Sequence, residues 1–120
     1  MIIREARADD ILRFSRYTIP QFIGLVAEED GRFIGACVVV WRDKRPILCL
    51  ELTQELRRRR VFLHRFARAS IGTVAKSLDV LYTMESPAEP TANRWLRRLG
   101  FEDTGELLNG ERLFQWRKSS

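Results

Sequence analysis

The sequence has little histidine and cysteine: its 120 residues contain one histidine, His64, and two cysteines, Cys37 and Cys49. So few imidazole and thiol ligands argue against a zinc site, and we expect no bound metal. Both cysteines lie in apolar runs, and the first residues lack the basic-then-apolar layout of a signal peptide. We therefore expect a cytoplasmic protein with buried free thiols, because disulfides persist mainly in oxidising compartments.

The chain also lacks long apolar runs, internal repeats, low-complexity segments and linkers. No run approaches the roughly 18 apolar residues of a membrane-spanning helix, so we expect no membrane partner. Hydrophobic residues make up 45% of the sequence and charged residues 31%, which is ordinary for a globular chain. We expect residues 1–120 to form one domain with its own core.

Acidic residues are outnumbered by basic ones. There are 16 Asp and Glu residues against 21 Lys and Arg residues, so the net charge is +5. This balance favours acidic partners such as phosphates or nucleic acid. Many of the arginines fall on helical patterns, where a solvated helix face explains them too. Nucleic acid therefore stays an open but not favoured partner.

The first half of the chain predicts a strand, a short helix and three further strands. Residues 1–6 alternate as a strand does, and the apolar residues that follow have helical spacing as far as Pro20: Ile11, Leu12, Phe14 and Tyr17. Apolar and β-branched runs then predict antiparallel strands over residues 22–29, 33–41 and 47–52. Asp30-Gly31 is typical of a tight hairpin between the first two of these.

The second half begins with the pattern of one long helix. It runs from about Thr53, a plausible N-cap, to Ser77, and its apolar stripe includes Leu56, Leu63, Phe66, Ile71, Val74 and Leu78. Residues 79–85 read as a strand entered by a parallel crossover. A helix from Pro90 to Leu99 ends at Gly100, and Asn109-Gly110 joins two last strands in a hairpin. The order predicts an α/β fold with a mixed, mostly antiparallel sheet.

One local motif together with this order resembles the GNAT (Gcn5-related N-acetyltransferase) superfamily. The motif is "TANRWLRRLGFEDTG", residues 91–105, in which Leu99-Gly100-Phe101 matches the apolar-Gly-Phe end of the family's last helix. The hairpin "EEDGRFIGAC", with Ile34-Gly35, is similar to the family's turn between its second and third strands. The resemblance implies a GNAT-like sheet flanked by helices. It also implies transfer of an acyl group from acetyl-coenzyme A to a small-molecule or protein amine.

The cofactor turn of that family is altered in this sequence. Its R/Q-x-x-G-x-G/A pattern falls on residues 57–62, where Arg57 matches but Arg60 and Phe62 occupy the two small-residue positions. Phe62 would fill space that the coenzyme needs, whereas arginine forks would replace the backbone nest by charge. The residues that the resemblance assigns to coenzyme binding are Leu52, Thr53, Arg57, Arg58, Arg59, Arg60, Val61 and Phe62.

The resemblance also assigns two catalytic candidates. Glu51 matches a strand glutamate that serves as general base, and burial in "ILCLEL" would raise its pKa towards the range a base needs. The alternative is that Glu51 pairs with an arginine at the strand end. Ser86 would donate a proton to the leaving thiolate, unless it is merely solvated. The family's usual tyrosine acid falls at Leu96, which cannot donate a proton.

A basic stripe on the long helix leaves three interpretations open. Arg57, Arg60, His64 and Arg68 recur at spacings of three and four residues. They form a solvated face, a surface for nucleic-acid phosphates, or a charge-based coenzyme site. The layout with a basic helix also resembles that of a small GNAT-like internal virion protein of T7-like phages. A non-catalytic phage or prophage protein is therefore the competing hypothesis.

Overall fold

Seven strands of this chain form one mixed sheet. The computed structural model describes residues 1–12, 21–85 and 92–118. The strands are β1 (Ile2–Glu5), β2 (Phe22–Glu29), β3 (Arg32–Arg42), β4 (Arg45–Leu52), β5 (Val80–Met84), β6 (Glu102–Leu108) and β7 (Glu111–Arg117). Their order is β1-β2-β3-β4-β5-β7-β6, and only β4 and β5 are parallel neighbours. The predicted α/β class, the antiparallel strands 22–52 and the parallel crossover are confirmed.

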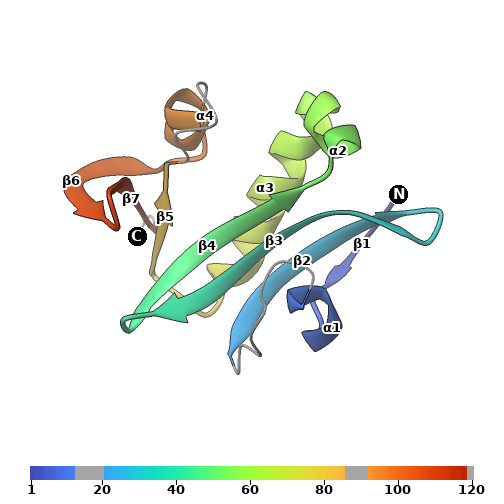
Figure 1. The fold of residues 1–120 in the computed structure, drawn as a ribbon, viewed down its shortest axis with the longest axis horizontal. Helices are drawn as coiled ribbons and strands as arrows, with labels where there is room; N and C mark the ends of the chain where they lie inside the picture. Colours follow the sequence, from blue (N-terminus) through green and yellow to red (C-terminus); the bar gives the residue numbers. More distant parts are fainter. Residues whose placement is uncertain (13–20, 86–91, 119–120) are drawn as a thin grey trace.

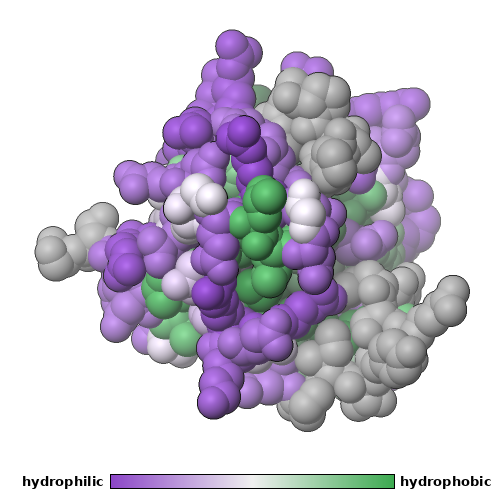
Figure 2. Space-filling view, turned by 60° about the vertical axis from the view of Figure 1, so that its left-hand side comes forward, coloured by the Kyte–Doolittle hydropathy of each residue, from purple (hydrophilic) through white to green (hydrophobic). Residues whose placement is uncertain are grey.

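Within the described ranges, four helices flank the sheet: α1 (Ala8–Ile11), α2 (Gln54–Arg58), α3 (Arg60–Val74) and α4 (Ala92–Arg98). Figure 1 shows α3 crossing one face of the sheet and α1 lying on the other. Seen from the side of β5, β6 and β7, the surface is mainly hydrophilic with a short apolar strip (Figure 2). No helix among the described residues is long and apolar enough to cross a membrane.

The core is split between the two faces because side chains alternate along each strand. The larger cluster lies under α2, α3 and α4 and includes Phe66, Phe101 and Phe114. The smaller cluster packs Ile11 of α1 on Val38 and its neighbours. Cys37 belongs to the first cluster and Cys49 contacts the second, so the two thiols point to opposite faces and cannot form a disulfide. Both are free, as expected, and burial raises the pKa of Cys37 to about 12.

The N-terminal elements are tied to β2 by a buried charge cluster. Arg4 donates two hydrogen bonds of 2.8 Å to the carboxylate of Asp10 and one of 2.9 Å to Glu28. These hydrogen bonds raise the pKa of Arg4 above its ordinary value. The bond to Asp10 has the larger effect and the bond to Glu28 the smaller. Ile11 confirms the predicted helix, whose further positions Phe14, Tyr17 and Pro20 lie outside the described residues.

The prediction of one continuous helix from Thr53 is wrong. Thr53 does cap a helix, but α2 ends at Arg58, and Arg59 has non-helical dihedrals (φ −96°, ψ 69°) before α3 begins at Arg60. The guanidinium of Arg59 lies 2.7 Å from a carboxylate oxygen of Glu29, at the end of β2, and 3.1 Å from one of Glu55. This tertiary ion pair accompanies the break at Arg59, and a new helix N-terminus follows it.

In the C-terminal half, α4 ends and the β6–β7 hairpin turns at the residues that the sequence predicts. Gly100 has a φ of +102°, and the N–H groups of Gly100 and Phe101 donate to the carbonyls of Arg97 and Leu96. This is a Schellman cap, which only glycine adopts without strain. Asn109 and Gly110 both have positive φ, as a two-residue hairpin requires. The predicted start of α4, at Pro90, lies outside the described residues.

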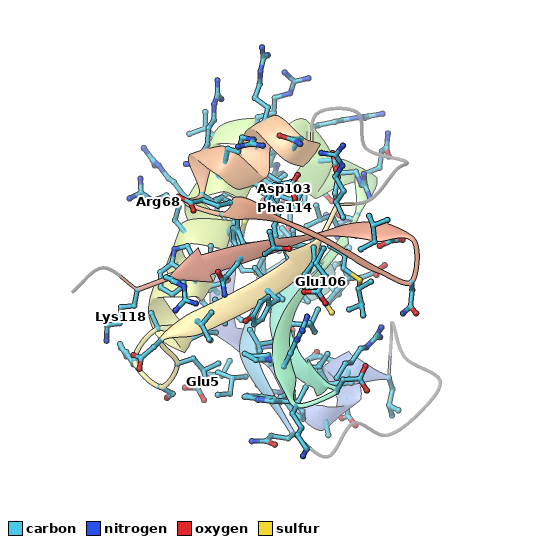
Figure 3. The ribbon with its side chains drawn as sticks, turned by 90° about the vertical axis from the view of Figure 1, so that its left-hand side faces the viewer. Glu5, Arg68, Asp103, Glu106, Phe114 and Lys118 are labelled. Carbon is cyan, nitrogen blue, oxygen red and sulfur yellow. The ribbon has the colours of Figure 1, made fainter. Side chains whose placement is uncertain are left out.

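Asp103 stabilises the β6–β7 hairpin in a way that depends on pH. Its carboxylate accepts hydrogen bonds of 2.9 Å from the Gly105 N–H and from Arg112, and these lower the pKa of Asp103. Figure 3 shows Asp103 and Phe114 on neighbouring strands beneath α4. The pKa of Asp in an unfolded chain is about 3.9. As the pH falls, Asp103 is therefore protonated in the unfolded chain at a higher pH than in the folded protein. This contribution to stability is complete above that pH and is lost as the pH falls through the lower folded pKa.

We therefore expect Asp103→Asn to destabilise the protein at pH 7 and to make almost no difference at a pH below the folded pKa of Asp103. The measurement is urea unfolding of both proteins at pH 7, 5 and 3, and at lower pH if both remain folded. The gap between their free energies of unfolding should narrow only below about pH 4. A gap of constant size over the whole range would contradict the assignment.

Candidate functional site

The strands β4 and β5 diverge and leave a cleft between them. The two strands pair at one position, Ile47 with Tyr82, although each strand continues beyond it. Beyond that point the Thr83 hydroxyl donates a hydrogen bond of 2.9 Å to the Leu48 carbonyl, so a side chain replaces the next ladder bond. The cleft has a volume of about 1180 Å³. Figure 1 shows the two strands parting, with α2 and then α3 following β4, and α4 following β5.

The cleft combines an apolar floor with a basic rim. Leucines of β4, α3 and α4 line it, and six arginines surround them: Arg57, Arg60, Arg65, Arg68, Arg94 and Arg98. Figure 3 shows Arg68 projecting outward from α3. None of the described residues that line the cleft is acidic. The electrostatic potential of this rim therefore favours an anionic ligand.

One hydrogen bond joins α3 to α4 across the cleft. The indole N–H of Trp95 donates to Nδ1 of His64 at 3.2 Å. Since Nδ1 accepts this bond, the neutral imidazole carries its proton on Nε2. His64 therefore cannot act as a base through Nδ1 while the bond is made. Trp95, predicted to be a core residue, packs on the larger core cluster and also lines the cleft.

Half of the residues predicted to bind the coenzyme line this cleft: Leu52, Arg57, Arg60 and Val61. Leu52 belongs to the end of β4, Arg57 to α2, and the other two to the first turn of α3. The break at Arg59 brings this first turn to the cleft. The first-turn N–H groups of a helix have no intrahelical acceptor, so they are available to an anion.

The other half lies elsewhere. The Thr53 hydroxyl donates to the Ile34 carbonyl at 2.7 Å and accepts from the Leu56 N–H at 3.3 Å. Arg58 is exposed and does not line the cleft, and Arg59 is engaged in its ion pairs. Phe62, expected to fill the coenzyme space, instead stacks on Phe66, with ring centroids 6.3 Å apart. The obstruction predicted from the sequence is therefore absent.

The two catalytic candidates are not brought together in the cleft. Glu51 is exposed, so the prediction that it is buried is wrong. Leu50 and Leu52 point to the core beneath α3, and the alternation of a strand turns Glu51 to the opposite face of the sheet, beside Ala36. Ser86 lies outside the described residues. Leu96, at the place of the family's acid, is 5% exposed and lies in the core.

Sequence reasoning missed Thr83 and Arg65. Thr83 is a buried polar residue within an apolar strand, and this contrast was the signal that could have identified it. Arg65 adjoins His64 and falls beside the predicted stripe, but only the packing of α3 shows that it reaches the cleft.

Comparison with known proteins is informative at the level of structure. No protein-family model and no curated protein sequence matches the chain. An IAA acetyltransferase from Bacillus cereus superposes with a TM-score of 0.68 at 13% identity, covering 98% of this chain and 99% of the other. A GNAT phosphinothricin acetyltransferase from Sinorhizobium meliloti, in complex with AcCoA, gives 0.64 at 20% identity, covering 92% and 68%.

A third similar structure is the PaiA N-acetyltransferase from Thermoplasma acidophilum, in complex with coenzyme A. Its TM-score is 0.57 at 14% identity, with 81% of this chain and 60% of the other covered. The chain thus spans less than two thirds of the length of this protein, and 64% and 60% of two other similar chains. The identities are low, so the likeness concerns the fold: the chain has the fold of the GNAT acetyltransferases.

Proposed function

We propose that this protein transfers an acyl group from acetyl-coenzyme A to an amine. The observation that carries the proposal is the cleft between β4 and β5, with the start of α3 and its arginines at the rim. Two proteins of the same fold were determined with coenzyme A or AcCoA. The proposal rests on that shared fold and on the chemistry of this chain's own cleft.

The residues of the cleft fit the coenzyme. Its phosphates are anionic, and Arg57, Arg60 and the first-turn N–H groups of α3 supply donors with positive charge. The floor formed by Leu48, Leu50 and Leu52 offers apolar contact to the methylene and methyl groups of the flexible coenzyme arm. The cleft volume of about 1180 Å³ is large enough for a cofactor-sized ligand. Phe62 does not oppose binding because its ring packs on Phe66.

Acetyl-coenzyme A would supply an acyl group activated as a thioester. Glu51 lies on the opposite face of the sheet, and none of the described residues that line the cleft is acidic. The incoming amine would therefore arrive as the free base or pass its proton to water, so the proposal predicts a slow enzyme. Ser86 remains our candidate for protonating the thiolate, because Leu96 cannot do so.

Coenzyme binding tests the proposal first. We expect millimolar coenzyme A to raise the melting temperature, since a ligand that binds only the folded state stabilises it. Arg60→Glu should weaken binding by about 10- to 100-fold, because it removes a charge-assisted hydrogen bond. Isothermal titration calorimetry measures this affinity. Arg117→Glu, an exposed arginine of β7 away from the cleft, is the control with the same charge change and should bind as the unaltered protein does.

Activity is then followed as thiol release from acetyl-coenzyme A in the presence of polyamines and of peptides with a free N-terminus. No thermal shift and no calorimetric signal with coenzyme A would overturn the proposal. That outcome would support the competing hypothesis of a non-catalytic GNAT-like phage or prophage protein. The observation in favour of that hypothesis is Leu96, which leaves the usual acid position buried and apolar.

A further inference from the structure

The cleft gathers six arginines on one surface. Arg4, Arg32, Arg45, Arg59 and Arg112 each pair with a carboxylate. Five of the six cleft arginines form no such pair with any described residue: Arg60, Arg65, Arg68, Arg94 and Arg98. Arginines without a carboxylate partner among the described residues also occur elsewhere, at Arg7, Arg42, Arg58, Arg97 and Arg117, so the clustering is what distinguishes the cleft. A cleft that concentrates positive charge without neutralising it is built for a ligand with several negative charges.

This charge extends beyond the proposed pyrophosphate site. That site needs only the first turn of α3, near Arg60. Arg68 lies eight residues further along the same helix, which is about 12 Å at the rise of an α-helix. Arg94 and Arg98 are one turn apart on α4, on the other side of the cleft. The two rows of arginine match a chain of phosphates more closely than a single pyrophosphate.

The cleft also offers flat and apolar surface between the two rows. Trp95 lines the cleft, and its hydrogen bond to His64 fixes the orientation of the indole. Val61, 70% exposed, lies on the rim. An aromatic ring inside a basic groove is the arrangement in which unpaired bases stack while the backbone lies on the charges. An acidic peptide would use the charges but would gain little from the indole.

We propose that this cleft binds single-stranded nucleic acid, through its phosphates and without sequence preference. A single strand is favoured over a duplex because its bases are free to reach the apolar floor and Trp95. This activity does not depend on the proposed acyl transfer.

The first test is the fluorescence anisotropy of a labelled oligothymidylate titrated with the protein at 50 mM salt, with no coenzyme present. Replacing Arg65, Arg68, Arg94 and Arg98 together by alanine should weaken binding at least tenfold. It should also reduce the slope of log K against log salt by about 0.7 for each phosphate that the variant no longer neutralises. The matched control removes four exposed charges away from the cleft: Arg42, Lys76, Arg117 and Lys118. It should leave the affinity and the slope nearly unchanged.

The second test asks whether bases stack on Trp95. In a W41F/W116F background Trp95 is the remaining tryptophan, and oligothymidylate should quench its fluorescence as it binds. Polyglutamate at the same charge concentration should compete only weakly for the arginines and should not quench the fluorescence. The proposal is overturned by an absence of binding at 50 mM salt, by equal losses in the cleft and control variants, or by polyglutamate that quenches Trp95 and displaces the oligonucleotide as effectively as unlabelled oligothymidylate does.

Discussion

Arg4→Met is expected to lower the free energy of unfolding by about 3 to 5 kcal/mol. Asp10 is only 4% exposed, and Arg4 supplies the cation that compensates its buried charge through two hydrogen bonds of 2.8 Å. Methionine keeps much of the side-chain volume but removes that cation. The loss is large because Asp10 keeps the Arg7 N–H as a donor but loses the cation that balances its buried charge.

Arg32→Met is the matched control for this prediction. Arg32 also pairs with a carboxylate, that of Glu55, but at 3.4 Å and with 63% of its side chain exposed. An exposed pair of this kind contributes about 1 kcal/mol or less. Urea unfolding at pH 7 measures both variants against the unaltered protein. If the two variants lost similar amounts of unfolding free energy, the burial of Asp10 would not be the reason why the Arg4 ion pair stabilises the protein.

Gly24→Ala should be the most damaging conservative change in the sheet, with a loss of about 3 kcal/mol or more. A Cβ atom at Gly24 would lie 2.3 Å from the Cys37 carbonyl oxygen and 2.6 Å from the Val38 Cα. Both contacts are with the backbone of β3, so no side chain can rotate away. Relief requires β2 and β3 to separate at the centre of the sheet, where Val38 is completely buried.

Gly72→Ala provides the opposite outcome in the same protein. Gly72 lies within α3, is exposed, and has nothing within 4 Å of the position its Cβ would occupy. Alanine there should stabilise the protein by about 0.5 to 1 kcal/mol, because glycine loses more backbone entropy in a helix. Melting curves of both variants give the comparison. A loss at Gly72, or a neutral result at Gly24, would contradict the packing described for that position.

The parts of the fold that were predictable are those with local causes. Asn109-Gly110 and Asp30-Gly31 specify tight hairpins by their tolerance of positive φ, and all four residues adopt it. Gly100 ends α4 for the same reason. The place of the basic cleft was also partly predictable, because the stripe formed by Arg60, His64 and Arg68 follows from helical spacing within α3.

The errors have causes that are distant in the sequence. At the helix break, Arg59 pairs with Glu29, which lies 30 residues earlier at the end of β2. No proline or glycine marks the break, so the continuous apolar stripe predicts a single helix. The orientation of Phe62 follows from that break. Glu51 has another cause: the apolar run "ILCLEL" predicts a strand covered on both faces, whereas the structure leaves Glu51 exposed at the end of β4.

The packing of Phe62 has a consequence for protein engineering. A designer who compared this chain with the glycine-rich turn of its fold relatives would restore the small residues at Arg60 and Phe62. Because Phe62 stacks on the completely buried Phe66 and not on the cleft, Phe62→Gly would empty part of the core without widening the cleft. Grafting the turn would therefore require Arg59 and its ion pair with Glu29 to be redesigned together with it.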